Sequence, residues 1–134
     1  MKMNAEKQNN SVLIVDDEIM NIRALQHILS SDYNILAERK GFNAVETAGK
    51  FMPDIILLDI IMPDIDGYEV ISKLKASGKT RNIPVIFISG LRNSEAEEKG
   101  LALGAADYIT KPFTVKDVKN KVEKHMRGNI NHER

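Results

Sequence analysis

Acidic side chains follow two apolar segments of the sequence, at the point where each segment ends. Asp16 and Asp17 come directly after Val12–Val15, and Asp59 comes directly after Ile55–Leu58. Uninterrupted runs of Val, Ile and Leu are typical of strands buried on both faces of a parallel sheet. The carboxyl ends of parallel strands meet at one edge of the sheet, so we expect the three carboxylates to converge there. Crowded carboxylates repel one another unless a cation neutralises them or one stays protonated, and the cluster therefore predicts a metal site.

Two further polar groups follow later strands of the predicted sheet. Ser89 comes directly after Val85–Ile88, and Lys111 comes soon after the short apolar pair Tyr108-Ile109. Mg²⁺ prefers oxygen ligands and commonly combines one or two carboxylates with a phosphoryl oxygen. A lysine ammonium and a hydroxyl at the same edge would bind the remaining phosphoryl oxygens. The set predicts a carboxylate that accepts a phosphoryl group.

Each of these residues also has an ordinary explanation when it is taken alone. An Asp after a strand commonly caps a helix or begins a turn, and Ser89 followed by Gly90 is a common turn pair. A lysine next to a proline, such as Lys111, is usually a solvated surface residue. The functional interpretation depends on the whole set, because complementary groups follow each of these strands.

Five short apolar segments are predicted strands, and amphipathic segments separate them. The strands are predicted at Val12–Val15, Tyr33–Leu36, Ile55–Leu58, Val85–Ile88 and Tyr108–Ile109. Apolar residues at helical spacing lie after each strand: Ile22, Leu25, Ile28 and Leu29; Val45, Ala48 and Met52; Val70, Ile71 and Leu74; Ala96, Gly100 and Leu103; and Val115, Val118 and Val122. This alternation predicts right-handed βαβ units and a parallel sheet covered on both faces.

Polar residues and glycines mark where several helices begin and end. The predicted caps are a capping box at Ser94–Glu97, a weaker version at Thr114 and Asp117, and Asp64 or Asp66 before the third helix. Gly100 and Gly104 are expected to end the fourth helix and turn the chain into the last strand. The fourth helix has the thinnest apolar stripe, so we expect it to shift most readily.

The composition fits one domain and excludes several function classes. The chain has 134 residues, and its 19 basic and 19 acidic side chains give no net charge, so no overall basic field attracts nucleic acid or a membrane surface. Cysteine is absent, which excludes disulfides and suits a reducing cytoplasm. No apolar run approaches the roughly 20 residues of a membrane span. We expect a disordered lead-in at residues 1–10, one domain at residues 11–126, and a polar tail or truncated linker at residues 127–134.

Four motifs occur in order along most of the chain. They are Val15–Glu18, Leu58–Pro63 with Asp66-Gly67 after it, Ile88–Gly90, and Asp107–Phe113. On these motifs the chain resembles the receiver domain of bacterial two-component response regulators, from Ser11 to Met126. The resemblance implies a flavodoxin-like (βα)5 three-layer α/β sandwich, with a five-stranded parallel sheet of order 2-1-3-4-5. It also implies a cytoplasmic signalling switch that catalyses only its own phosphorylation and dephosphorylation.

The resemblance assigns a role to each acid of the cluster. Asp59 would accept the phosphoryl group from a phosphohistidine. Asp17 and Asp59 would hold Mg²⁺, or alternatively Mn²⁺. Asp16 would act mostly through a water, and the backbone carbonyl of Ile61 would complete the protein ligands.

The resemblance also assigns roles to the residues that face these acids. Lys111 would pair with Asp59 and then with the phosphoryl oxygens, from a Lys111–Pro112 peptide that is expected to be cis. Ser89 would move to bond a phosphoryl oxygen, and Tyr108 would turn inward as it does so. The surface formed by the fourth helix, fifth strand and fifth helix would then change.

The partners that the resemblance implies are signalling proteins. The phosphoryl donor would be a sensor histidine kinase or a histidine phosphotransfer protein. The switched domain would then control a downstream effector or an output domain. A phosphorylation-dependent homodimer is a further option. No output domain is recognisable after Met126, although residues 100–113 resemble receivers attached to cyclic-dinucleotide enzymes and hybrid kinases.

The rim of the predicted site departs from the usual family pattern. Gly90 follows Ser89, where alanine is more common, and Ile61 and Leu91 stand two residues after Asp59 and Ser89. Apolar side chains at these two positions offer no hydrogen bond to an attacking water. We therefore predict a phosphorylated state that persists.

Three alternatives remain open. A haloacid-dehalogenase-type phosphatase would need a second acid two residues after the nucleophile, where Ile61 stands. A flavodoxin would need a Gly/Ser/Thr phosphate loop in place of Asp16-Asp17-Glu18. A receiver-like module that is never phosphorylated is the third. His27, His125 and His132 lack zinc-ligand spacing and are expected to be structural or solvated.

Overall fold

The computed structural model describes residues 10–126, which contain a parallel sheet of five strands. The strands are β1 (Ser11–Val15), β2 (Asn34–Glu38), β3 (Ile55–Leu58), β4 (Val85–Ser89) and β5 (Asp107–Thr110). Their order across the sheet is β2-β1-β3-β4-β5. This confirms the predicted fold class and strand order, with most strand ends differing by one or two residues. Apart from Asn10, the predicted lead-in and tail lie outside the described residues.

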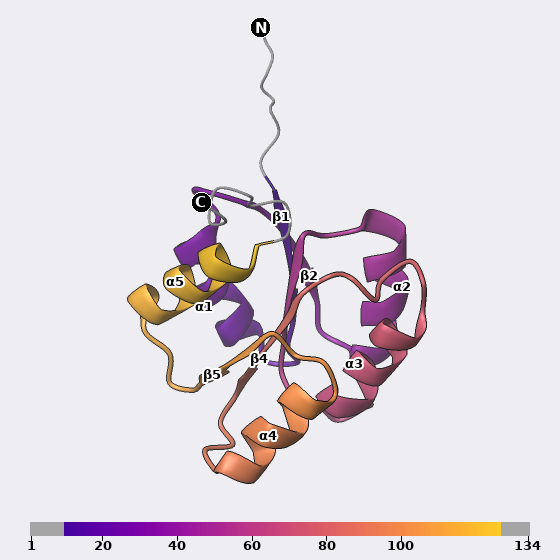
Figure 1. Ribbon diagram of the computed structural model, residues 1–134. Helices are drawn as coiled ribbons and strands as arrows, with labels where there is room; N and C mark the ends of the chain where they lie inside the picture. The colour runs from indigo at the N-terminus through magenta and orange to yellow at the C-terminus, as the bar shows by residue number, and fades with distance from the viewer. Residues whose placement is uncertain (1–9, 127–134) are drawn as a thin grey trace, which may run out of the picture.

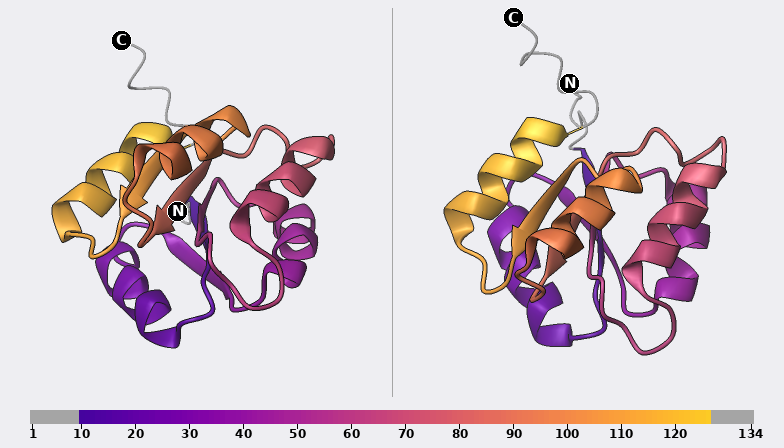
Figure 2. Two further views of the ribbon diagram at one scale, coloured as in Figure 1. Left: turned by 90° about the horizontal axis from the view of Figure 1, so that it is seen from below. Right: turned by 60° about the horizontal axis from the view of Figure 1, so that its bottom comes forward.

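The helices of residues 10–126 cover both faces of the sheet. They are α1 (Ile19–Leu29), α2 (Gly41–Phe51), α3 (Gly67–Ala76), α4 (Ser94–Ala102) and α5 (Val115–His125). α1 and α5 lie on one face, and α2, α3 and α4 lie on the other (Figure 1, Figure 2). In this part of the chain, no helix has the length and apolar character to cross a membrane.

The central strands contribute to two separate cores. In β3, Ile56 and Leu58 belong to the core shared with α2 and α3, while Ile55 and Leu57 belong to the core shared with α1 and α5. Successive side chains of a strand point to opposite faces, so a strand covered on both sides needs an apolar residue at every position. This explains the uninterrupted apolar run before Asp59.

The predicted apolar faces of α1 and α3 are confirmed. In α2 and α5, the prediction of a buried face residue is wrong at one position each. α2 ends at Phe51, so Met52 leaves the helical repeat and is 37% exposed; Ala44 is buried instead. Val115 is the first residue of α5 and is 54% exposed, because α5 joins the core only from Val118 onward.

Aspartate and threonine side chains fasten helix ends. Asp66 and Thr114 cap α3 and α5 as predicted, accepting hydrogen bonds from backbone amides at 2.9 and 3.0 Å. Asp64, the alternative cap for α3, instead accepts hydrogen bonds from the amides of Gly41 and Phe42 at 3.2 and 3.0 Å. The loop after β3 therefore fixes the beginnings of both α2 and α3.

The beginning of α4 differs from the prediction. The capping box at Ser94 is wrong, because Asn93 occupies the N-cap position and accepts a hydrogen bond from the Ala96 amide at 2.7 Å. Asn is among the strongest N-cap residues, so α4 begins at Ser94, one residue earlier than a Ser94 cap would allow.

The two glycines near the end of α4 have different roles. Gly100 lies inside α4, so the prediction that it ends the helix is wrong. A Cβ at Gly100 would lie 2.8 Å from the ring of Phe87, so the close approach of α4 to β4 requires glycine. Gly104 has a φ of 112° and turns the chain toward β5, as predicted.

The described domain begins and ends on the same side of the sheet, at the amino ends of the parallel strands. β1 begins at Ser11, and α5 runs back across the sheet to end next to Met126, which packs in the same core as Val12 (Figure 1). The acids that follow β1 and β3 lie at the opposite edge.

Candidate functional site

The carboxyl ends of β1 and β3 bring three acids together. Val15 pairs with Leu58 across the two strands, and the Asp59 amide donates to the Val15 carbonyl at 2.9 Å. Carboxylate oxygens of Asp16, Asp17 and Asp59 lie within 4.8 Å of one another. The three acids singled out in the sequence therefore form one cluster.

Burial determines the electrostatics of this cluster. Asp16 is 2% exposed and Asp59 is 5% exposed, whereas Asp17 is half-buried. Burial, followed by the charge of Asp16, raises the pKa of Asp59 to about 6, against the opposing effects of Lys111 and backbone hydrogen bonds. A bound cation would relieve this repulsion, and the all-oxygen donor set fits a hard cation such as Mg²⁺.

Lys111 provides positive charge at the cluster. Its Nζ lies 3.2 Å from a carboxylate oxygen of Asp16 and 3.6 Å from one of Asp59. The Lys111–Pro112 peptide is cis, and the Lys111 amide donates to the Ser89 carbonyl at 2.8 Å. One ammonium facing three carboxylates leaves an excess of negative charge when all three are ionised, which favours a further cation.

Ser89 reaches the same edge from β4 and is fully buried. Its Oγ accepts a hydrogen bond from the Leu91 amide at 3.2 Å, a contact that does not use the hydroxyl hydrogen. An open pocket exposes the site to solvent, and its lining residues are Asp17, Glu18, Asp59, Ile61, Ser89, Gly90 and Lys111. Ile61 is 60% exposed at the rim, and a Cβ at Gly90 would meet nothing within 4 Å. The rim therefore combines an apolar side chain with open space.

Tyr108 lies beside the site, beneath the loop that precedes α4. Its side chain is inward and only 6% exposed, and its hydroxyl donates to the Leu91 carbonyl at 2.9 Å. Burial raises the pKa of this hydroxyl. Because the amide of Leu91 also donates to Ser89, both side chains contact the same loop residue.

Two arginines that the sequence analysis did not single out hold the loops of the site. Arg39 donates two hydrogen bonds, at 3.3 and 3.0 Å, to the backbone carbonyl of Asp17. Arg92 donates to the backbone carbonyl of Lys111 at 3.0 Å. Backbone carbonyls carry no sequence information, so no motif points to these contacts.

The histidines do not join the acid cluster. His125 lies 2.8 Å from a carboxylate oxygen of Asp107, on the fifth strand and helix. Burial raises the pKa of Asp107, but hydrogen bonds from the Tyr108 amide and His125 outweigh it and hold the pKa below its usual range. His27 is exposed, and His132 lies outside the described residues.

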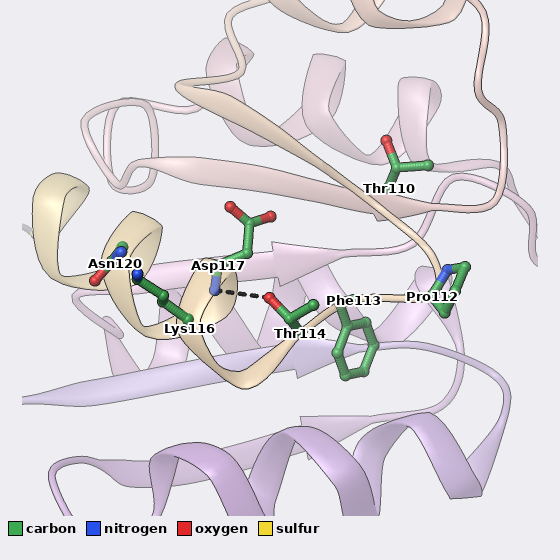
Figure 3. A pocket seen from close by; sticks show the side chains of 7 residues that line it. All are labelled: Thr110, Pro112, Phe113, Thr114, Lys116, Asp117 and Asn120. Atoms are coloured by element: carbon green, nitrogen blue, oxygen red, sulfur yellow. Dashed lines mark hydrogen bonds between the residues drawn. The ribbon is translucent and has the colours of Figure 1, made fainter.

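A second pocket lies beside α5 and is separate from the acid cluster (Figure 3). Its lining residues are Thr110, Pro112, Phe113, Thr114, Lys116, Asp117 and Asn120. Thr114 and Asp117 are joined by the hydrogen bond that caps α5 (Figure 3). Asp117 is its single acid, so this pocket does not reproduce the donor set of the cluster.

A sequence model of one protein family, the response regulator receiver domain, matches residues 12–123. The chain belongs to this family. Receiver domains are the phosphoryl-accepting switches of two-component systems, so the acid cluster lies in a domain of that function. This assignment sets aside the phosphatase and flavodoxin alternatives.

Two relatives agree with this family. The receiver domain is 42% identical over 118 residues to a probable cyclic di-GMP phosphodiesterase of Vibrio cholerae, covering 88% of this chain and 27% of that protein. It is 41% identical over 103 residues to the response regulator PleD of Caulobacter vibrioides, a match that covers 76% of this chain and 23% of PleD. The chain thus spans about a quarter of the length of these relatives.

A solved structure with the same fold contains a metal ion in its own active-site cleft. It is the receiver domain of a sensor histidine kinase from Pseudomonas aeruginosa, with a magnesium ion coordinated in its active-site cleft. The TM-score is 0.81 at 26% identity, and the match covers 87% of this receiver domain and 97% of the other.

Proposed function

We propose that Asp59 accepts a phosphoryl group from a phosphohistidine of a sensor kinase or a histidine phosphotransfer protein. The supporting observation is the position of Asp59, which lies with two other acids and 3.6 Å from the ammonium of Lys111, in a pocket that Ser89 also lines. In the transfer, a carboxylate oxygen of Asp59 forms a bond to phosphorus, the phosphorus–nitrogen bond of the donor breaks, and the donor imidazole leaves.

The pKa of Asp59 suits this role. At about 6, it leaves the carboxylate mostly ionised at neutral pH, as a nucleophile must be. Lys111 lies close enough to neutralise a phosphoryl oxygen after transfer, and the hydroxyl hydrogen of Ser89 can be donated to another. Asp17, Asp59 and the Ile61 carbonyl would hold Mg²⁺, with Asp16 acting mostly through a water, and the ion would neutralise charge at the reacting oxygens.

The readout that we propose runs through the loop before α4. Ser89 and Tyr108 both contact Leu91, so a phosphoryl group that draws Ser89 toward it alters the contacts of this loop. The surface of α4, β5 and α5 then presents a different arrangement to a partner. In this proposal the domain is a switch that catalyses only its own phosphorylation and dephosphorylation. Its place of action is the cytoplasm.

The proposal includes an output partner and, after phosphorylation, a homodimer. Control of cyclic di-GMP turnover is the first output to test, because the Vibrio relative is named as a probable phosphodiesterase of that nucleotide. Sedimentation with and without beryllofluoride tests the homodimer.

Beryllofluoride and Mg²⁺, which together imitate a phosphorylated aspartate, test the central assignment. Amide resonances at the acid cluster and around α4 are expected to shift in the natural protein and to stay unchanged in Asp59→Asn. Labelling by acetyl phosphate that hydroxylamine removes should likewise disappear in that variant. Labelling that survives in Asp59→Asn would assign the phosphoryl group to another residue.

The apolar rim gives the proposed phosphorylated state a long lifetime. Ile61 is exposed at the pocket and offers no hydrogen bond to an attacking water. Ile61→Asn is expected to speed the decay of phospho-Asp59, because an amide can orient that water. Equal decay rates in the two proteins would contradict this role.

A further inference from the structure

Within the described chain, α4 has little apolar anchorage. Its buried residues are Ala96 and Gly100, whereas the neighbouring α3 buries Val70, Ile71 and Leu74. The stabilisation from burial scales with apolar area, so two small residues hold α4 only weakly against the sheet. Polar and aromatic contacts therefore carry more of the positioning of α4 than of α3.

Two tyrosine hydroxyls reach the backbone at the beginning of α4 from different elements. Tyr108 of β5 donates to the carbonyl of Leu91, in the loop before α4, at 2.9 Å. Tyr68, the second residue of α3, donates to the carbonyl of Ala96, in the first turn of α4, at 3.1 Å. Lys99, one turn further along, places its Nζ 4.3 Å from the centroid of the Tyr68 ring. The first two turns of α4 thus contact both the hydroxyl and the ring of Tyr68.

The two tyrosines are also joined by a row of aromatic rings. The Tyr68 ring meets Phe87 edge-on with centroids 5.6 Å apart, and the Phe87 ring lies 6.3 Å from that of Tyr108. Gly100 brings the backbone of α4 directly onto Phe87. A rearrangement of Tyr108 therefore changes the packing of Phe87, which both Tyr68 and α4 contact.

The end of α3 that carries Tyr68 is itself fixed next to Asp59. The Gly67 amide donates to the Ile60 carbonyl at 2.7 Å, and a Cβ at Gly67 would overlap the backbone carbonyl of Asp59. Tyr68 thus extends from a fixed point of the phosphoryl-accepting loop to the helix that has the least anchorage.

We propose that the Tyr68 hydroxyl is a second tether of α4: a positioning residue that holds the first turn of the helix and opposes its movement. The regulatory consequence rests on the proposed function, since the movement that it opposes is the switch that phosphorylation of Asp59 drives. Tyr68 contacts α4 and β4, so it acts on the position of α4 and not on phosphoryl transfer.

Tyr68→Phe in the full chain tests the tether, because it removes the hydroxyl and keeps the ring. Amide hydrogen exchange in α4 is expected to be roughly fivefold faster, the effect of losing one hydrogen bond of ordinary strength. Without beryllofluoride, the α4 resonances should already lie part of the way toward their positions in the natural protein with beryllofluoride and Mg²⁺. Resonances of Asp16 and Asp17 should not move.

Tyr33→Phe is the matched control, since Tyr33 packs against the core on the other face of the sheet. It should leave exchange in α4 unchanged. Unaltered α4 exchange in Tyr68→Phe overturns the tether, and so does a uniform acceleration in α3, α4 and α5, which would indicate general destabilisation. If beryllofluoride and Mg²⁺ shift no resonance of the natural protein, the proposed function is refuted. The comparison of α4 exchange rates without beryllofluoride still tests the tether in that case.

Discussion

α3 and α4 lie on the same face of the sheet, but they are held in different ways. α3 has an aspartate cap, three large buried side chains and a first residue packed on the backbone of Asp59. α4 has an asparagine cap and two small buried residues. The Tyr68 hydroxyl bonds its first turn, its own Lys99 lies over the Tyr68 ring, and Tyr108 bonds the loop before it. The difference is one of anchorage: α3 is packed on the backbone of the loop after β3, whereas α4 is held with little buried apolar area.

The largest difference between α3 and α4 is expected in the free energy of unfolding that is lost when a leucine side chain is truncated. Leu74→Ala in α3 is expected to lower the free energy of unfolding by about 3 kcal/mol, because the side chain is fully buried and leaves a cavity. Leu101→Ala in α4 should cost less than about 0.5 kcal/mol, since Leu101 is 44% exposed. Urea unfolding measures both values, and equal costs would contradict the comparison.

The acid cluster beside α3 should destabilise the protein when no metal is present. Asp59 has a pKa of about 6 in the folded state against 3.8 in the unfolded chain, so its contribution is most favourable below pH 4 and is lost as the pH rises to about 6. Asp59→Asn should therefore stabilise the metal-free protein by about 2 kcal/mol at pH 7 and by much less at pH 4.

Thermal unfolding of the natural protein and Asp59→Asn across this pH range, in a chelating buffer, measures the difference. Addition of Mg²⁺ should stabilise the natural protein more than the variant. A difference that does not depend on pH would show that Asp59 is not under electrostatic strain.

A methyl group beneath α4 should test how closely that helix approaches the sheet. Gly100→Ala is expected to destabilise the protein by about 1–2 kcal/mol, because the new Cβ would lie 2.8 Å from Phe87 and lift the helix. Gly49→Ala in α2 is the control, since its Cβ meets nothing within 4 Å, and it should stabilise by about 0.5–1 kcal/mol. Opposite signs in denaturant unfolding are the expected result, and two stabilising substitutions would contradict it.

The smallest difference in stability is expected when the N-cap side chains of α3 and α4 are removed. Asp66→Ala and Asn93→Ala should each cost about 1 kcal/mol, since both side chains accept a hydrogen bond from a backbone amide. The consequences should differ, because only α4 lacks large buried side chains. Amide exchange should quicken along much of α4 in Asn93→Ala and only in the first turn of α3 in Asp66→Ala.

The sequence was most informative where chemistry and burial coincide. The acids after β1 and β3 could be located because an apolar run must precede them, and the strand order followed from the family resemblance. Contacts between a side chain and a distant backbone carbonyl could not be foreseen. Arg39, Arg92 and Tyr68 act in this way, and the carbonyls that they contact belong to loops or helices far along the chain.

The positions where the described chain enters and leaves this domain have a practical consequence. The start of β1 and the end of α5 lie on the same side of the domain (Figure 1), and Val12 and Met126 pack in one core; Asp59 follows the carboxyl end of β3. A domain with neighbouring ends can be spliced into a host polypeptide as a cassette, and its acidic edge then stays accessible to a donor. A fluorescent reporter of phosphorylation could be built by grafting the domain through these two ends.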